Sequence, residues 1–100
     1  MKIEMPLKEI RAFCQKWDIK EFAIFGSILR DDFSLENSDI DVLILFDEKT
    51  TLFDIVDMKT ELEILFKRPV DIVSKRSIEN SSNKFKREEI LNKSEVLYAA

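Results

Sequence analysis

Two short stretches of the sequence carry residue types that could do chemistry together. Gly26 and Ser27 end an apolar run, and Asp39 and Asp41 open the most hydrophobic segment of the chain. Gly26 is the only glycine among the 100 residues. Alternate side chains of a strand point to the same face, so Asp39 and Asp41 are expected to share a face where that strand begins. Two neighbouring carboxylates repel each other and favour a cation between them, which points to a divalent metal site.

The glycine–serine pair is suited to binding phosphate. Gly26 has no Cβ, so its backbone can approach a ligand closely, and N–H groups at the start of a helical turn bind phosphate oxygens. The Ser27 hydroxyl adds a donor, and Arg30 would share a face of the turn with Ser27 and reach the same phosphates. The alternative for Arg30 is an ordinary surface arginine beside Asp31 and Asp32.

A third acid, Asp71, interrupts another short apolar strand, expected at residues 70–73. With Asp39 and Asp41 it would complete a two-metal site, in which one ion activates the attacking oxygen and the other holds the phosphates. The alternative for Asp71 is an edge-strand charge that discourages aggregation, and for Asp39 and Asp41 a pair of solvated acids. Histidine is absent, so acid–base or metal chemistry must use carboxylates, lysine, hydroxyl groups or water.

Several elements must position these residues. Hydrophobic periodicity predicts helices at residues 6–17, at 51–67 and from 77 onward. Short apolar runs predict strands at 21–25, 39–46 and 70–73, and an edge strand or docked tail at 95–98. A helical turn is expected at 28–30 and a loop at 31–38. This order predicts an α/β fold, a single domain over residues 1–100 with a small mixed β-sheet flanked by helices.

The apolar faces of these elements identify the expected core. The strand at 39–46 is apolar on both faces, so helices should cover both, or one should meet a partner. Cys14 lies on an apolar helical stripe, so a buried and inert thiol is expected. Thr51 should cap the second helix, with Asp54 completing a capping box. The stripe expected in that helix is Leu52, Ile55, Val56, Leu62, Leu65 and Phe66. The weaker stripe of the last helix is Ile78, Phe85, Ile90 and Leu91.

Charge and composition limit the partners. The formal net charge is −4, with +4 in residues 67–93 and −8 in the remainder. Direct nucleic-acid binding is not expected, because such binding depends largely on the neutralisation of phosphates by basic residues. No stretch has the length and apolarity of a membrane span or a signal peptide. A single cysteine permits no internal disulfide, which fits a reducing cytoplasm.

Taken together, these residues resemble a known family. The apolar strand before Gly26 and Ser27, the eleven-residue gap that follows, Asp39-Ile40-Asp41, the later Asp71 and the closing Val96-Leu97-Tyr98 are similar to the minimal nucleotidyltransferase (MNT) domains of the DNA polymerase β-like superfamily. The resemblance covers nearly the whole chain, and the set with this spacing is specific. It implies the polymerase β-like nucleotidyltransferase fold. It also implies transfer of a nucleoside monophosphate from a nucleoside triphosphate to an acceptor hydroxyl.

The resemblance also implies roles for individual residues. Gly26 and Ser27 would bind the triphosphate of ATP, the expected substrate. Asp39, Asp41 and Asp71 would hold two Mg²⁺ ions. Asp71 would in addition help to deprotonate the acceptor hydroxyl, because a carboxylate beside a metal ion is the base available in a chain without histidine.

The partner is implied in the same way. Nothing in 100 residues is left over for an acceptor-binding domain, so the acceptor is expected on a partner or a second copy, in a homo- or hetero-oligomer. Stand-alone chains of this type resemble the MntA-type antitoxins of HEPN–MNT toxin–antitoxin pairs, which add AMP to a tyrosine of the HEPN RNase. Two other interpretations stay open. One is a non-catalytic antitoxin that neutralises a partner by occlusion, and the other is a small-molecule (antibiotic) nucleotidyltransferase subunit.

Overall fold

The computed structural model of the chain describes residues 5–26 and 39–100. The helices of this part are α1 (Leu7–Lys16), α2 (Leu52–Phe66), α3 (Lys75–Glu79) and α4 (Lys84–Asn92). Its strands are β1 (Glu21–Phe25), β2 (Ile40–Leu45), β3 (Val70–Ser74) and β4 (Glu95–Ala99). All four predicted strands are confirmed to within one residue at each end. The turn and loop predicted for residues 28–38 lie outside the described residues.

The four strands of the described part form one mixed sheet in the order β3-β2-β1-β4. β2 and β3 run parallel, whereas β1 runs antiparallel to both β2 and β4. The connection from β2 to β3 passes through α2, because parallel neighbours need a crossover rather than a hairpin. The predicted small mixed sheet is therefore confirmed, and β3 and β4 are its edge strands.

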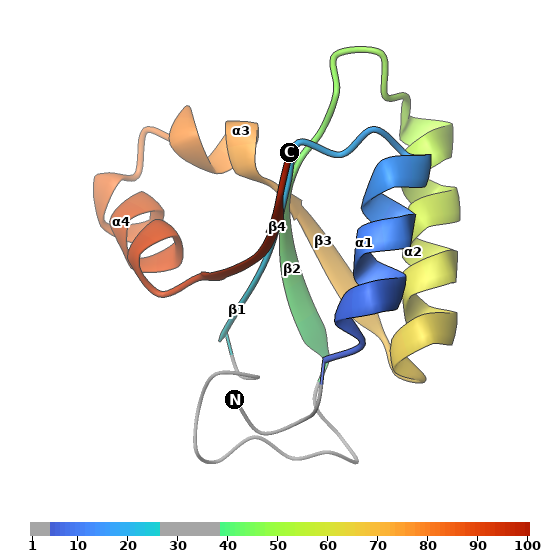
Figure 1. Ribbon diagram of the computed structural model, residues 1–100. Coiled ribbons are helices and arrows are strands. Elements are labelled where there is room, and N and C mark those ends of the chain that lie inside the picture. Colours follow the sequence, from blue (N-terminus) through green and yellow to red (C-terminus); the bar gives the residue numbers. More distant parts are fainter. Residues whose placement is uncertain (1–4, 27–38) are drawn as a thin grey trace.

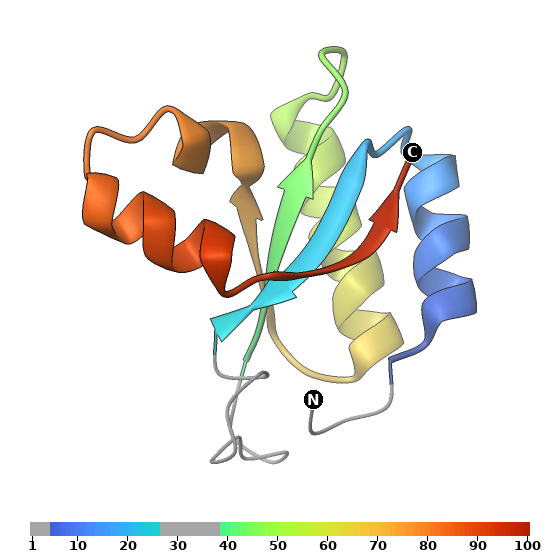
Figure 2. The same ribbon diagram turned by 60° about the vertical axis from the view of Figure 1, so that its left-hand side comes forward.

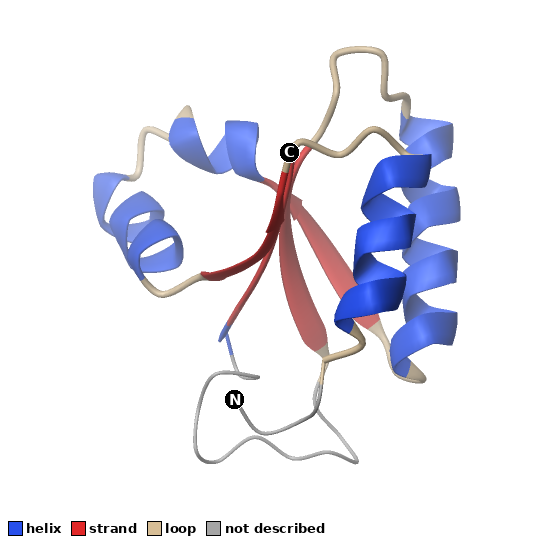
Figure 3. Ribbon diagram, in the orientation of Figure 1, coloured by secondary structure: helices blue, strands red, loops and turns tan. Residues whose placement is uncertain are grey.

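Helices cover both faces of the sheet (Figure 1, Figure 3). α1 and α2 lie on one face, while α3 and α4 lie on the other. Because strand side chains alternate between faces, Ile40, Val42 and Ile44 of β2 are fully buried towards α1 and α2. The smaller core on the α3–α4 face is built on Ala23, Leu43 and Ile78. The expectation that helices cover both faces of β2 is confirmed.

The caps of α2 follow the sequence closely. The Asp54 N–H donates to Thr51 Oγ1 (3.2 Å), and the Thr51 N–H donates to Asp54 Oδ2 (3.0 Å), which is the predicted capping box. Lys67 ends the helix in the left-handed conformation, with φ of 58°. Pro69 lies two residues after Lys67 and leads into β3. Proline has no N–H to donate to a helical hydrogen bond, so α2 cannot continue through this position.

The predicted apolar face of α2 is partly wrong. Met58 and Leu62 are fully buried and Phe66 nearly so, but the Leu52 and Val56 side chains, predicted to face the core, are exposed. The α2 outer face consists of Leu52, Phe53, Val56 and Ile64, which are 80%, 84%, 63% and 71% exposed. The error arises because α2 is apolar on two sides, and periodicity cannot tell which side the sheet covers.

The single helix predicted from Ser77 onward is also wrong, because two helices, α3 and α4, occupy this segment. Each has its own N-cap. Ser74 Oγ accepts from the Ser77 N–H (3.4 Å) and Asn83 Oδ1 accepts from the Lys86 N–H (3.0 Å). Short polar side chains compete for backbone groups and so interrupt a helix. Phe85, predicted to be apolar core, is 78% exposed on α4.

Cys14 is fully buried on α1, as predicted. Burial disfavours the charged thiolate and raises the pKa of the Cys14 thiol to about 12. The predicted burial of the thiol is therefore confirmed, and the raised pKa disfavours the reactive thiolate. No helix of the described residues has the length and apolarity required to cross a lipid bilayer.

Candidate active site

The end of β1 and the starts of β2 and β3 meet at one end of the sheet (Figure 2). Phe25, the last residue of β1, pairs with Asp41 in β2. Gly26 follows Phe25 directly, and Asp39 stands immediately before β2. The antiparallel pairing of β1 with β2 therefore brings the glycine of the motif and its two aspartates to the same end of the sheet.

Asp41 and Asp71 occupy matched positions on neighbouring strands. In the parallel register of β2 and β3, Asp41 pairs with Asp71. Two residues further on, Leu43 and Val73 belong to the core under α3 and α4, so alternation places both carboxylates on that face of the sheet. α3 begins after the opposite end of β3. The prediction that Asp71 lies near the start of the strand beside Asp41 is confirmed, while its catalytic role stays a prediction.

Gly26 lies directly against the Asp41 carboxylate. Its φ is +77°, in the left-handed region that side chains rarely adopt. A Cβ added at this position would overlap Oδ2 of Asp41 and lie 3.3 Å from its Cγ. Backbone conformation and contact therefore both exclude a side chain here. In this structure the group that Gly26 approaches closely is the Asp41 carboxylate, and its approach to a phosphate ligand stays a prediction.

The carboxylates at this site fit Mg²⁺ by their chemistry. Asp41 is half-buried, while Asp39 and Asp71 are exposed. Within residues 5–26 and 39–100, no three His, Cys, Asp or Glu side chains form a group that could by itself hold a metal ion. Mg²⁺ in nucleotide-dependent sites is typically bound by one or two carboxylates, with substrate phosphates and water as the other ligands. The carboxylates of Asp41 and Asp71, at matched positions on β2 and β3, are consistent with a Mg²⁺ site in which the protein supplies only one or two ligands.

Ser27 and Arg30 lie outside the described residues, so their phosphate-binding roles stay predictions.

Two α2 side chains that contact Val70 were not predicted from the sequence. Lys59 Nζ donates to the Val70 carbonyl (2.9 Å), and Glu63 Oε2 accepts from the Val70 N–H (3.0 Å). A lysine and a glutamate four residues apart are common on helix surfaces, so the sequence contains no signal for this contact.

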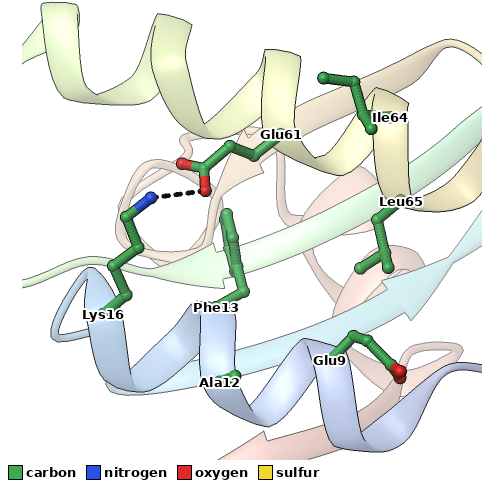
Figure 4. Close-up of a pocket in the computed structure, with 7 residues that line it drawn as sticks. All are labelled: Glu9, Ala12, Phe13, Lys16, Glu61, Ile64 and Leu65. Carbon is green, nitrogen blue, oxygen red and sulfur yellow. Dashed lines mark hydrogen bonds and ion pairs between the residues drawn. The ribbon is translucent and has the colours of Figure 1, made fainter.

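A separate groove lies between α1 and α2 (Figure 4). These two helices cover the face of the sheet opposite the one that carries Asp41 and Asp71 (Figure 1). The volume of the groove is about 430 Å³, and it is lined by Glu9, Ala12, Phe13, Lys16, Glu61, Ile64 and Leu65. Lys16 Nζ and Glu61 Oε1 form an ion pair at 2.7 Å, and Trp17 Nε1 donates to Glu61 Oε2 at 2.8 Å. These contacts join the two helices, so the groove belongs to helix packing and not to the carboxylate site.

The chain is similar to proteins named as protein adenylyltransferases. It is 35% identical over 85 residues to a protein of Methanocaldococcus jannaschii named as a putative protein adenylyltransferase, over 80% of this chain and 86% of that protein. It is 33% identical over 73 residues to the protein adenylyltransferase MntA of Thermococcus cleftensis, over 73% of this chain and 70% of that protein.

The fold and the family are shown by two further comparisons. A chain from the structure of the tri-AMPylated Shewanella oneidensis HEPN toxin in complex with MNT antitoxin matches with a TM-score of 0.64, over 94% of this chain and 70% of that chain. Its sequence identity of 17% makes this a likeness of fold alone. The family model described as a nucleotidyltransferase domain matches residues 7–97, which include Gly26, Asp39, Asp41 and Asp71. The expected fold is thus confirmed, and the chain belongs to the nucleotidyltransferase domain family.

Proposed function

We propose that this domain transfers AMP from ATP to a hydroxyl group of a partner protein, namely a tyrosine of a HEPN-type toxin, in a Mg²⁺-dependent reaction. The observation that carries the proposal is the register that sets Asp71 beside Asp41, next to Gly26, in a chain of the nucleotidyltransferase family. The two relatives named as protein adenylyltransferases support AMP as the transferred group and a protein as the acceptor.

Asp39, Asp41 and Asp71 are the residues that would hold Mg²⁺ in this proposal. Carboxylate oxygens suit this hard cation, and the like charges of Asp41 and Asp71 at matched strand positions favour a cation between them. When bound, Mg²⁺ supplies neutralisation of phosphate charge and makes the acceptor hydroxyl more acidic.

The chain itself supplies orientation and a base. Gly26 keeps the end of β1 against the Asp41 carboxylate, so that a triphosphate beside one also meets the other. The hydroxyl oxygen of the acceptor attacks the α-phosphorus of ATP. The bond between this phosphorus and the oxygen that links the α- and β-phosphates breaks. Pyrophosphate leaves with the electron pair of this bond. Asp71, exposed at the start of β3, takes the proton of the hydroxyl.

The α2 outer face supports a protein as the source of the acceptor. Its four large apolar side chains are all more than half exposed. Several large apolar side chains gathered on one exposed face are typical of a protein-contact surface. The HEPN toxin is proposed as this partner because the similar fold occurs in a complex with an AMPylated HEPN toxin.

The direct test measures transfer of label from α-labelled ATP, in the presence of Mg²⁺, to a HEPN protein encoded beside this one. We expect label on a tyrosine of the HEPN protein, and its loss in the Asp41→Asn and Asp71→Asn variants. Asp18→Asn is the matched control, because Asp18 is an exposed acid before the start of β1, at the end of that strand opposite Gly26. Absence of transfer by folded wild-type protein would contradict the proposal.

The exposed α2 outer face also favours a second candidate, neutralisation of the partner by occlusion alone. Two double variants distinguish the candidates. Asp39→Asn/Asp41→Asn removes two carboxylates of the site, whereas Val56→Lys/Ile64→Lys changes only exposed residues of α2. Full neutralisation of the partner's RNase activity by the first variant, and none by the second, would establish occlusion. Loss of neutralisation in the first variant, with binding retained, supports transfer of AMP.

A further inference from the structure

The start of β3 is an inherently weak part of the sheet. β3 is an edge strand, so only one of its sides is bonded to a neighbour. Pro69, immediately before β3, has no N–H to donate. Asp71 lies opposite Asp41 in the register, and like charges on neighbouring strands destabilise their pairing. The ladder bonds to β2 therefore hold this end of β3 on one side only, and contacts on the open side can add to its stability.

The peptide groups of Val70 face away from β2. The Ile40 N–H of β2 donates to the Pro69 carbonyl (3.0 Å), so that carbonyl points towards β2. Peptide groups of successive residues in a strand point to opposite sides, which turns the N–H and C=O of Val70 towards the open edge. An unpaired edge of this kind would otherwise be left to solvent.

Two side chains of α2 satisfy both peptide groups of Val70. Glu63 Oε2 accepts from its N–H at 3.0 Å, and Lys59 Nζ donates to its carbonyl at 2.9 Å. The two side chains also pair with each other at 3.8 Å, four residues apart on the helix. Their neighbours Met58 and Leu62 are fully buried, so this part of α2 is anchored in the core. We call the Lys59–Glu63 pair and its two bonds to Val70 the β3 clamp.

We infer that the β3 clamp positions Asp71 for Mg²⁺ binding and phosphoryl transfer. Val70 directly precedes Asp71, so fixing both peptide groups of Val70 fixes the backbone from which the Asp71 side chain projects. The clamp opposes the repulsion between Asp71 and Asp41 that acts before a cation is bound. Lys59 and Glu63 are positioning residues in this inference, and the inference rests on the proposed role of Asp71.

The test compares variants of the clamp with variants of an ordinary helical ion pair. Glu63→Leu removes the acceptor for the Val70 N–H, Glu63→Gln keeps a carbonyl acceptor, and Lys59→Met removes the donor. Lys84 and Glu88 on α4 are the matched control pair, also four residues apart, with Nζ and Oε1 at 3.9 Å. The control variants are Lys84→Met and Glu88→Leu. Melting temperatures measured without ligand establish that each variant is folded.

Three measurements follow the effect from the backbone to the site. Amide hydrogen exchange at residue 70 should accelerate at least about tenfold in Glu63→Leu, because the N–H loses its acceptor. Mg²⁺ affinity, from titration with Mg²⁺ alone followed by the Asp71 NMR signals, should weaken by roughly 10–100-fold, as for other groups that orient metal ligands. The kcat for AMP transfer should fall by a similar factor. Glu63→Gln should retain most of both functions, and the α4 variants should match wild type.

The outcomes separate the clamp from the proposed function. Wild-type protein that neither binds Mg²⁺ nor transfers AMP overturns both. If wild type does both and Glu63→Leu keeps its Mg²⁺ affinity and kcat despite faster exchange, the clamp is only structural and the inference is overturned. Unchanged exchange at residue 70 overturns it as well. Should Glu63→Leu fail to fold, the Mg²⁺ affinity and kcat of Lys59→Met carry the comparison, because this variant removes the other bond to Val70.

Discussion

Replacement of Gly26 by alanine should damage both the fold and the site, because the structure gives two independent reasons for a glycine there. A φ of +77° costs a residue with a Cβ roughly 1–2 kcal/mol. For a domain of this size, each kcal/mol corresponds to about 4–8 °C in melting temperature. We therefore expect Gly26→Ala to lower the free energy of unfolding by about 1–2 kcal/mol and the melting temperature by roughly 4–16 °C.

The second reason concerns Asp41. The alanine Cβ would overlap Oδ2 of Asp41, and a carboxylate can rotate away more easily than a strand can shift. The overlap should therefore appear in function more than in stability. A displacement of about 1 Å at a reacting centre can cost on the order of 10²-fold in rate. We expect a loss of that order in the proposed AMP transfer, together with a weaker affinity at the proposed Mg²⁺ site.

A double-mutant cycle with Asp41→Ala separates the two effects. Urea unfolding measures the loss of stability that the positive φ causes in Gly26→Ala. This loss should be the same in wild type and in Asp41→Ala to within about 0.5 kcal/mol. The effect of Gly26→Ala on Mg²⁺ affinity and AMP transfer should vanish when the Asp41 carboxylate is already absent. Gly26→Ala protein with wild-type stability, Mg²⁺ affinity and activity would refute the geometry described here. Lost stability with intact Mg²⁺ affinity would refute only the contact with Asp41.

Three further predictions concern single residues. Asp71→Asn should raise the melting temperature slightly in the absence of Mg²⁺, because one of two neighbouring charges is removed, and should abolish the stabilisation by Mg²⁺ and ATP that we expect in thermal melts of wild type. Thr51→Ala should lower the free energy of unfolding by about 1 kcal/mol in urea titrations, through loss of the capping box, while AMP transfer stays unchanged. Burial raises the pKa of the Cys14 thiol from 9.0 to about 12, so its contribution to stability is complete below pH 9 and is lost as pH rises towards 12. The stability difference between wild type and Cys14→Ala should therefore shrink over that interval by up to about 1.4 kcal/mol per pH unit, and a difference independent of pH would contradict a buried thiol.

Local signals in the sequence were sufficient to predict the strands, the start of α2 and the nucleotidyltransferase motif. Apolar runs bounded by polar residues located the strands, because a strand needs only a few consecutive β-favouring side chains. Thr51 and Asp54 located the start of α2, because a capping box is a contact within four residues. The spacing of Gly26, Asp39 and Asp41 indicated the nucleotidyltransferase family, which the comparison confirmed.

The faces of the helices were harder to predict. α2 is apolar on two sides, so Val56 and Met58 are equal candidates for burial until the sheet is in place. The segment after β3 contains enough apolar residues for one helix, yet the caps at Ser74 and Asn83 divide it into two. Hydrophobic periodicity permits burial of either side of α2, and it permits one helix or two after β3. Packing against the sheet decides the first case, and the N-caps decide the second.

The acids, their spacing and the strands that carry them could be predicted from the residues alone. The pairing of Asp41 with Asp71, and the contacts that hold β3, follow from the packing of α2 and the sheet. Asp71 stands opposite Asp41 because α2 returns the chain for a parallel pairing of β3 with β2. Lys59 and Glu63 hold Val70 because the same helix packs beside the edge of β3. Both arrangements depend on the packed core, because only the core sets the register of β3 against β2 and the position of α2 beside the edge of β3, so no local pattern could contain them.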